Sequence, residues 1–321
     1  MRAIQVEQFG GPEVLQLVEL PAPTPTESEV LIEVSAAGVN YADTHQTENS
    51  YLSQQHLPMV PGGEVIGRTP DGRRVLGFTS TGTGGYAERA VLNQFMAVPV
   101  PDGITDGQAL ALLVQGLTAW HLLRTVGRLT DGETVVVNAA AGGVGNLAVQ
   151  LAKLWGAGRV IALASSDSKR ELALSLGADV ALDSNSDDLK AAVRSANGGR
   201  GVDIVLEMAG GSAGDQLLAS LGAFGRFITY GMASREAMTP IAPGTLMVGS
   251  KTVSGFWLMD CMKPNKIATM VAVPLQELLA LVASGELRPI AADSFPLAQA
   301  ADAHRALLAR TTTGKVILTM D

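Results

Sequence analysis

The first hundred residues contain short runs in which apolar and polar positions alternate, and turn-forming residues separate these runs. The runs are RAIQVEQF, VLQLVEL, EVLIEVSAAGV, EVIGRT, RRVLGF, GGYAERAVL and QFMAVPVP. Strands of this length and spacing predict a small all-β unit, folded as a partly closed barrel. The proline-rich stretch at 21–29 is expected to be a surface loop between two strands.

From about Gly107 the apolar residues recur at helical intervals, and strand-like and helix-like segments then alternate. The predicted strands are ETVVVNA, GRVIALAS, DVALD, VDIVLEMAG, GRFITYG and KTVSGFWL, and the predicted helices follow Gly143 and cover 168–176, 187–196 and 213–221. Six strands joined by crossover helices predict a doubly wound parallel sheet. The tail is expected to return to the first domain through helices at 275–284 and 298–308, a strand near Ile290 and the final strand GKVILTM.

Composition narrows the class of protein. A chain of 321 residues with 47 % hydrophobic residues is long enough for two globular domains. Its net charge of −8, without a basic run, argues against nucleic acid as a partner. The single cysteine, Cys261, excludes an internal disulfide and fits a cytoplasmic protein. Polar residues interrupt the most apolar region, 135–163, so no membrane span is expected, and four dispersed histidines suggest no metal site.

The segment NAAAGGVGNLAVQLAK, at 138–153, places its smallest residues where a strand should turn into a helix. In the register of the dinucleotide-binding fingerprint it supplies Ala140, Gly142 and Gly145, with Gly143 and Val144 between the two glycines. Small residues allow a tight turn, close approach of a pyrophosphate to the backbone, and close helix–strand packing. A dinucleotide site is therefore predicted here, and the alternative is a glycine loop that serves packing alone.

The end of the second predicted strand indicates which dinucleotide binds. An NAD site carries an acidic residue there for the ribose hydroxyls, whereas this chain has Ala164, followed by Ser165, Ser166 and Lys169. Without a carboxylate to repel a 2′-phosphate, and with hydroxyls and a cation nearby, NADP(H) is favoured. The alternative is that Ser166 or Asp167 caps the next helix and Lys169 is a solvated surface charge.

Together, several motifs along the whole chain resemble the zinc-independent quinone oxidoreductases, the zeta-crystallin branch of the medium-chain dehydrogenase/reductase superfamily. The motifs are AAGVNYADTH, VPGGEVIG, GGYAERAVL, QGLTAWHLL, AAAGGVG, SLGAD, GRFITYG, SGFWL and TTGKVIL. The resemblance implies a GroES-like substrate domain from residues 1–118 and 260–321, a Rossmann NADP(H)-binding domain at 119–259, and an active cleft between them. It also implies hydride transfer from NADPH to a small-molecule quinone or conjugated carbonyl.

The resemblance also assigns roles to individual residues. Asn40 and Tyr51 match residues of the substrate cleft, and Thr118 matches a threonine near the nicotinamide. Lys169 matches the lysine that faces the 2′-phosphate, and Arg310 matches an arginine that reaches the same phosphate. Tyr230 and Gly231 match a turn beside the cofactor, while Phe256 and Trp257 match the segment after the last Rossmann strand. Asn40 and Gly63 occupy two positions where zinc enzymes of the superfamily carry metal ligands, so no catalytic zinc is expected.

Some positions depart from the family pattern, namely His45, Glu48, Asn49 and Ser184. His45 stands where the family often has a second cleft tyrosine; it could donate a proton, since histidine titrates near neutral pH, or be a hydrogen-bonded loop histidine. Tyr51 could be a cleft donor or an ordinary half-buried aromatic residue. His121 is expected to be a packing histidine, and Cys261 is expected to be a buried or interface thiol.

The leading functional prediction is a zinc-independent NADPH:quinone oxidoreductase. An enone or 2-enoyl thioester reductase is the alternative, because a conjugated double bond offers a similar electron-poor target to hydride. A different class is a non-catalytic NADPH-binding sensor or structural protein. The resemblance further implies a homodimer formed through the edge strand around 251–257, whose apolar residues would otherwise be exposed.

Overall fold

The computed structural model describes residues 1–320 and divides the chain into two compact units. The first unit comprises Met1–Gln115 and Leu275–Asp321, and the second comprises Gly116–Pro274. Each is described by itself below.

A seven-stranded sheet is the centre of the first unit, and the long strand β3 (Glu29–Val39) organises it. The other strands are β4 (Glu64–Arg68), β5 (Arg74–Phe78), β6 (Arg89–Asn93), β7 (Val98–Pro99), β14 (Asp293–Pro296) and β15 (Val316–Thr319). The order is β14-β15-β3-β4-β5-β7, with β6 also paired to β3. An isolated bridge between Thr79 and Leu92 connects the end of β5 to β6, so the sheet curls into the predicted partly closed barrel.

Two predicted strands of this unit pair outside the seven-stranded sheet, and two other strand predictions need correction. The strands β1 (Arg2–Gln5) and β2 (Gln16–Glu19) form a separate antiparallel hairpin. The run QFMAVPVP begins with a 3-10 turn, Gln94–Met96, because the Asn93 side chain caps it at the Phe95 N–H, and only the two residues of β7 are assigned as strand. The strand expected near Ile290 begins at Asp293 instead, where β14 pairs in parallel with β15.

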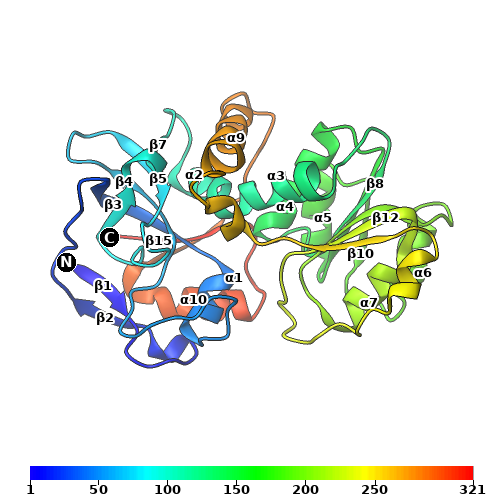
Figure 1. Ribbon diagram of the computed structural model, residues 1–321, viewed down its shortest axis with the longest axis horizontal. Helices are drawn as coiled ribbons and strands as arrows, with labels where there is room; N and C mark the ends of the chain where they lie inside the picture. The colour runs from blue at the N-terminus through cyan, green and yellow to red at the C-terminus, as the bar shows by residue number, and fades with distance from the viewer. Residues whose placement is uncertain (321) are drawn as a thin grey trace. The chain divides into compact units, whose positions relative to one another are not determined.

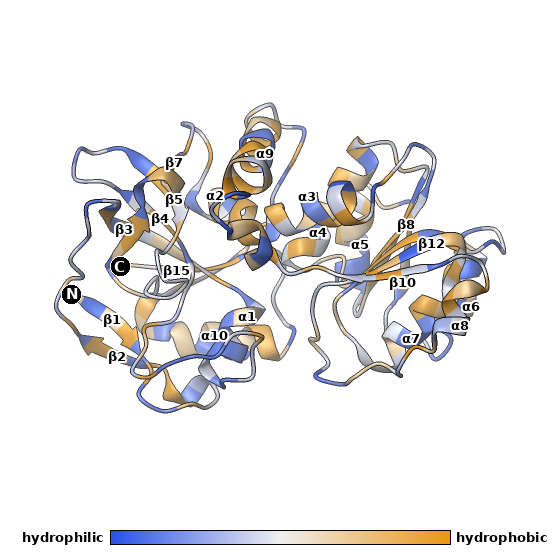
Figure 2. Cartoon of the chain, in the orientation of Figure 1, coloured by the Kyte–Doolittle hydropathy of each residue, from blue (hydrophilic) through white to orange (hydrophobic). Residues whose placement is uncertain are grey.

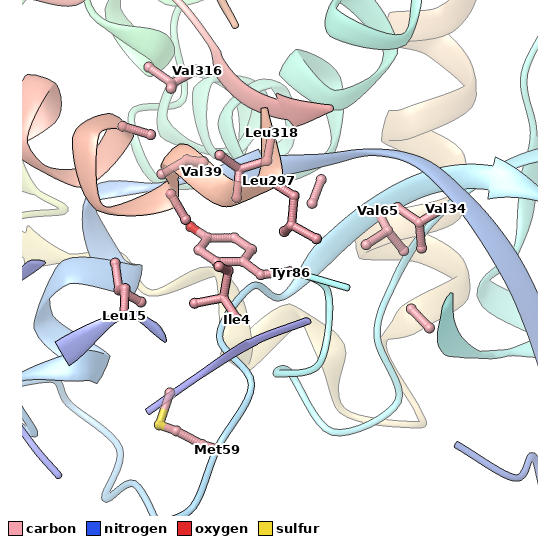
Figure 3. Close-up of a cluster of buried hydrophobic side chains, with 14 of the residues drawn as sticks. Ile4, Leu15, Val34, Val39, Met59, Val65, Tyr86, Leu297, Val316 and Leu318 are labelled. Carbon is pink, nitrogen blue, oxygen red and sulfur yellow. The ribbon is translucent and has the colours of Figure 1, made fainter. Parts of the chain in front are cut away.

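The first unit contains helices in both of its chain segments, and both chain ends contribute to its apolar core. The helices are α1 (Tyr41–Thr47), α2 (Asp106–Ala111), α9 (Val273–Ala283) and α10 (Ala300–Leu308), with 3-10 turns at Pro12–Val14 and Leu297–Gln299. Figure 3 shows the ring of Tyr86 at the middle of this core, with Ile4, Val39 and Leu297 around it. Residues from β1, β3, α10 and β15 thus share one apolar cluster.

The second unit contains the predicted six-stranded parallel sheet. Its strands are β8 (Thr134–Val137), β9 (Arg159–Ala164), β10 (Val180–Asp183), β11 (Val202–Glu207), β12 (Leu221–Thr229) and β13 (Thr252–Gly255). All neighbours are parallel and the order is β10-β9-β8-β11-β12-β13. Numbered within the sheet this is 3-2-1-4-5-6, the doubly wound dinucleotide-binding order, in which the strand order reverses beside β8.

Helices cover both faces of this sheet. They are α4 (Gly143–Leu154), α5 (Asp167–Ser175), α6 (Leu189–Ala196), α7 (Gly211–Ser220) and the short α8 (Pro243–Met247). Figure 1 shows α6 and α7 side by side on one face and α4 on the other. Leu189, Val193 and Leu217 of these helices pack against Val136 and Phe227 of the strands. Figure 2 shows the central strands coloured as hydrophobic, as expected for a sheet covered on both faces.

One helical run, Asp106–Val126, is apolar and long enough to cross a membrane by length and composition. Its most apolar window is 72 % buried within the protein, as in the core helix of a globular domain. The run contains two π-helical turns, Leu112–Gly116 and Leu122–Val126, which flank α3 (Leu117–His121). Such turns are frequent at functional sites.

Candidate functional site

The glycine-rich turn connects β8 to α4, at the point where the strand order reverses. Ala139 has a left-handed backbone (φ 53°), and its carbonyl accepts a hydrogen bond from the Gly142 N–H (2.9 Å). Ala140 is fully buried and donates its N–H to Leu163 of the neighbouring strand (2.9 Å). The methyl group of Ala140 is therefore accommodated inside the protein, and Ala139 is half-buried.

The two glycines are required for different reasons. A Cβ at Gly145 would lie 2.2 Å from the Ala139 carbonyl oxygen and 2.7 Å from the Ala140 Cα, so α4 could not pack this closely on the turn. A Cβ at Gly142 would find its nearest neighbour at 3.1 Å. Gly142 is the N-cap residue of α4, and no side chain caps the helix there. The first N–H groups of α4, including those of Gly143 and Val144, are thus the donors that a helix N-terminus offers to an anion.

A buried polar pair, Asn138 and Glu207, lies next to the turn. Asn138 follows β8, and its Nδ2 donates to Oε1 of Glu207 at the end of the adjacent β11 (3.0 Å). The same carboxylate accepts the backbone N–H groups of Ala209 (2.7 Å) and Gly210 (3.1 Å). Glu207 is fully buried, and these three donors explain how its charge is accommodated.

The predicted 2′-phosphate region follows β9. Ala164 is buried at the end of the strand, Ser165 is exposed, and Ser166 is the N-cap of α5, where its Oγ accepts the Lys169 N–H (3.4 Å). The predicted capping role of Ser166 is therefore confirmed, and capping is compatible with phosphate binding at the same helix end. Two carboxylates also lie here, since Arg170 forms ion pairs with Asp167 and with Asp183 (3.5 Å).

The remaining predicted cofactor residues of the second unit follow β12 and β13 or lie in α3. Tyr230 follows β12, and its backbone N–H donates to the Glu207 carbonyl oxygen (3.0 Å). Burial raises the pKa of the Tyr230 phenol, and the charge of Glu207 acts in the same direction, so the phenol stays neutral. Gly231 comes next, and a Cβ there would lie 3.0 Å from Met208 O. Phe256 and Trp257 follow β13, and Thr118 is buried in α3. The turn, the start of α5, Tyr230 and Phe256 thus all follow carboxyl ends of parallel strands, where ligands of such sheets bind.

His121 is a packing residue, as predicted. Its Nδ1 lies 2.7 Å from Thr125 Oγ1 and its Nε2 lies 2.6 Å from Met270 O, so both ring nitrogens are satisfied. Its ring stacks on Phe256 at 5.5 Å between centroids. Burial lowers the pKa of His121, which favours the neutral ring. Cys261 is likewise buried.

In the first unit, Asn40 is the N-cap residue of α1 and is 8 % exposed. Its Nδ2 donates to Glu64 Oε1 (2.7 Å), and its Oδ1 accepts from the ammonium of Lys315 (3.0 Å). Lys315 and Glu64 form an ion pair with each other, and both are fully buried. Gly63, which precedes Glu64, has no side chain to offer a ligand.

A second buried network begins at the backbone of the same asparagine. Asp43 Oδ2 accepts the Asn40 N–H (2.8 Å) and the hydroxyl proton of Tyr86 (2.9 Å). Since that proton is used, the Tyr86 oxygen must accept from Nε2–H of His304, 3.1 Å away. Burial raises the pKa of Asp43 to about 6 and lowers that of His304 to about 4. His304 is therefore neutral at pH 7, and its Nδ1 has no hydrogen-bond partner.

His45 lies on helix α1 rather than in a loop. Its Nδ1 is 2.8 Å from Ser50 Oγ and it is 6 % exposed. The centroid of its ring is 5.5 Å from that of Tyr41 and 6.5 Å from that of Tyr51. The structure thus brings His45 and Tyr51 together. Arg310, at the end of α10, is exposed.

Across residues 1–320, no three His, Cys, Asp or Glu side chains gather in an arrangement that could hold a metal ion.

The buried polar residues Asp43, Glu64, Tyr86, Glu207, His304 and Lys315 were not singled out from the sequence. The signal available was a charge inside an apolar run, as in GGEVIG and TGKVIL. A buried charge must be paired, so these two opposite charges could have been matched as partners.

The comparisons with known proteins agree with this architecture. The alcohol dehydrogenase GroES-like domain family matches residues 26–72, and the zinc-binding dehydrogenase family matches residues 143–274. A solved quinone oxidoreductase from Thermus thermophilus, whose study includes its complex with NADPH, is 36 % identical with a TM-score of 0.89 over 100 % of both chains. The quinone oxidoreductase of Pseudomonas aeruginosa is 32 % identical over 99 % of this chain and 99 % of its own.

A further relative is much longer. One of the polypeptides of the phenolphthiocerol/phthiocerol polyketide synthase of Mycobacterium tuberculosis is 32 % identical over 99 % of this chain, which spans only 15 % of that polypeptide.

A GroES-like unit together with a Rossmann unit defines the medium-chain dehydrogenase/reductase class. Within that class, the chain belongs to the quinone oxidoreductase family, as full-length identities of 32 % and 36 % show.

Proposed function

We propose that this protein is an oxidoreductase that binds NADPH at the N-terminus of α4 and reduces a quinone by direct hydride transfer without zinc. The observation that carries the proposal is the turn itself: Gly142 places no side chain at the N-cap of α4, where a pyrophosphate would approach, and Gly145 lets α4 pack closely on the turn. The Thermus thermophilus relative has been solved in complex with NADPH. The cofactor supplies the hydride, and the side chains of this protein bind and orient the reactants.

The choice of NADPH over NADH is supported by the charges after β9. Ala164 occupies the position where an acidic residue would bind ribose hydroxyls. The two nearby carboxylates, Asp167 and Asp183, are both paired with Arg170, which offsets their repulsion of a phosphate dianion. Lys169, with Ser165 and Ser166, is proposed to contact the 2′-phosphate. Arg310 is assigned to the same phosphate by family resemblance.

The absence of zinc chemistry is supported by the residues at the two superfamily ligand positions. Gly63 offers no ligand, and the Asn40 oxygen faces the Lys315 ammonium. An ammonium at 3.0 Å would repel a divalent cation bound to that oxygen. The acceptor must therefore be reducible without a Lewis acid, as quinones and conjugated carbonyls are.

The proposed acceptor contacts are Asn40, His45 and Tyr51, with Thr118 beside the nicotinamide. Asn40 can donate a hydrogen bond to an acceptor oxygen, which gains negative charge as hydride arrives. His45 and Tyr51 are the candidate proton donors, and the hydrogen bond of His45 to Ser50 fixes its ring.

An enone or enoyl thioester reductase is the second candidate. It is favoured by the 32 % identity to a segment of a polyketide synthase. A steady-state panel of quinones, enones and 2-enoyl thioesters with NADPH separates the two. Quinone-dependent oxidation of NADPH supports the first proposal; turnover of enoyl compounds alone overturns it; saturable NADPH binding with no turnover indicates a sensor.

A homodimer is proposed through β13, the edge strand of the six-stranded sheet. Large apolar side chains near it are exposed, namely Phe224 (76 %), Met247 (78 %) and Val248 (76 %). Exposed apolar residues beside an unpaired strand are typical of an association surface. Light scattering with size-exclusion chromatography should give twice the chain mass, and a monomer at micromolar concentration would contradict this. The cytoplasmic location stays a prediction.

A further inference from the structure

The buried ion pair of Lys315 and Glu64 has no role in the chemistry proposed so far. Lys315 directly precedes β15, and Glu64 is the first residue of β4; β3 lies between these two strands. Both side chains are 0 % exposed. The pair is completed by Asn40, which donates to Glu64 (2.7 Å) and accepts from Lys315 (3.0 Å), so that the three side chains form a closed triangle.

The surrounding backbone is shaped to hold this triangle. Gly38 of β3 lies against Glu64, and a Cβ at that position would be 2.2 Å from Oε1 of the carboxylate. The second oxygen, Oε2, accepts the backbone N–H of Val114 (3.0 Å). Val114 belongs to the π-helical turn Leu112–Gly116, in which the usual helical hydrogen bonds are shifted. Both oxygens of Glu64 are therefore used.

Stability alone does not account for such a pair. Removing two charges from water costs several kcal/mol per ion, and the attraction between them often fails to exceed that cost. In other proteins, replacing such a pair with apolar residues of similar volume is often neutral or stabilising. The charges instead have an effect that apolar side chains could not have, which is to fix the orientation of the neighbouring amide.

We infer that the Lys315–Glu64 pair positions Asn40 for the proposed reaction. An ammonium only donates hydrogen bonds and a carboxylate only accepts them. The Asn40 oxygen must therefore face Lys315 and its NH₂ group must face Glu64. A flipped amide would place its NH₂ donors against the ammonium of Lys315 and its oxygen against the carboxylate of Glu64. This inference rests on the proposed function of Asn40 as a group that contacts the reacting molecule.

The fixed orientation has a chemical consequence for the ligand. One N–H of the Asn40 amide is used by Glu64, and the other is the hydrogen-bond donor that Asn40 can present. The group it meets must therefore be an acceptor, such as a carbonyl oxygen. A donor that is held in place contributes most where charge develops, so its loss is expected in kcat rather than in the KM of the acceptor.

The test uses the double variant Lys315→Met/Glu64→Gln, which removes both charges and approximately keeps both side-chain lengths. We expect kcat with a quinone to fall tenfold or more, with the acceptor KM within about twofold. A matched control is Lys153→Met/Asp179→Asn, which makes the same kind of change at a partly exposed ion pair (3.0 Å) in the second unit, and it should keep kcat within about twofold.

A double-mutant cycle shows whether the pair acts through Asn40. In an Asn40→Ala background, the same two substitutions should cause no further loss of kcat beyond about twofold. The inference is overturned if the losses multiply, or if the folded double variant keeps full kcat while Asn40→Ala loses tenfold. A merely structural role would lower the yield or thermal stability in both backgrounds alike.

A readout without turnover keeps the inference separate from the proposed function. In ¹⁵N-labelled protein, the side-chain amide of Asn40 can be assigned by its absence in Asn40→Ala. We expect its protons to exchange slowly with solvent in the wild type and at least tenfold faster in Lys315→Met, or in the double variant if the single one does not fold. Fast exchange in the wild type overturns the positioning, whereas slow exchange in a protein that oxidises no NADPH would count against the proposed function only.

Discussion

Replacing Asp43 with asparagine tests the buried network around Tyr86. The asparagine oxygen can still accept from the Asn40 N–H and from the Tyr86 hydroxyl, so both hydrogen bonds can be retained while the titrating group is lost. Burial raises the folded-state pKa of Asp43 to about 6 from an ordinary value of 3.8, and the charge of Glu64 acts in the same direction. The Asn40 N–H, Tyr86 and Lys315 oppose this rise.

The sign of the effect follows from which state binds the proton. Between the two pKa values the unfolded chain has released the Asp43 proton and the folded protein still holds it. The wild type therefore loses stability from this group as pH rises, and the loss is complete above about pH 6. Its size is the pKa difference of about 2.2 multiplied by 1.36 kcal/mol, or about 3 kcal/mol, of which about 2 kcal/mol falls between pH 4 and pH 7.

The assay is urea unfolding of both proteins at several pH values from 4 to 7, followed by circular dichroism. Tryptophan fluorescence is unsuitable alone, because Trp120, Trp155 and Trp257 all lie in the second unit. The unfolding free energy of Asp43→Asn minus that of the wild type should rise by about 2 kcal/mol across this range. A difference that is constant with pH, or that falls, would refute the argument that burial controls this carboxyl.

Three other substitutions test the dinucleotide site. Gly145→Ala should lower the unfolding free energy by about 1–3 kcal/mol, because its Cβ would meet backbone atoms at 2.2 Å; a wild-type urea midpoint would be inconsistent with the packing. Gly142→Ala is its matched control and should lower the unfolding free energy by less than about 1 kcal/mol. It should nevertheless raise the Kd of NADPH about tenfold, and unchanged binding would contradict the proposed pyrophosphate position. Lys169→Ala should raise the Kd of NADPH about tenfold and leave that of NADH unchanged, and equal losses for both would argue against a 2′-phosphate contact.

Much of the second unit could be predicted from the sequence because its signals are local. Each strand of the parallel sheet is a short apolar run followed by a turn, and the glycines that shape the turn before α4 are close together in the chain. The prediction placed the helices α5, α6 and α7 within two residues of their observed ends.

The errors in the first unit arose where local and distant signals compete. The run before β7 has the composition of a strand, yet Asn93 caps a 3-10 turn in it. The strand β14 lies three residues beyond Ile290, at a register set by pairing with β15, which the sequence of β14 alone does not specify.

The polar core of the first unit depends on contacts between distant segments. Asp43, Tyr86 and His304 come from three parts of the chain, and so do Asn40, Glu64 and Lys315. Local patterns mark each of them only as a polar residue in an apolar context. The partners of Asn40 become apparent only when β3, β4 and β15 are side by side, and those of Tyr86 only when α1 and α10 are packed together.

The measurement that tests NADPH-dependent reduction most directly is a parallel fluorescence titration of the wild-type protein with NADPH and with NADH, followed by addition of a quinone to each complex in a stopped-flow instrument. The proposed site predicts a Kd for NADPH at least tenfold below that for NADH, and loss of the bound NADPH signal in a single exponential phase after the quinone is added. Equal affinity for the two cofactors, or a bound NADPH signal that no quinone removes, would contradict it.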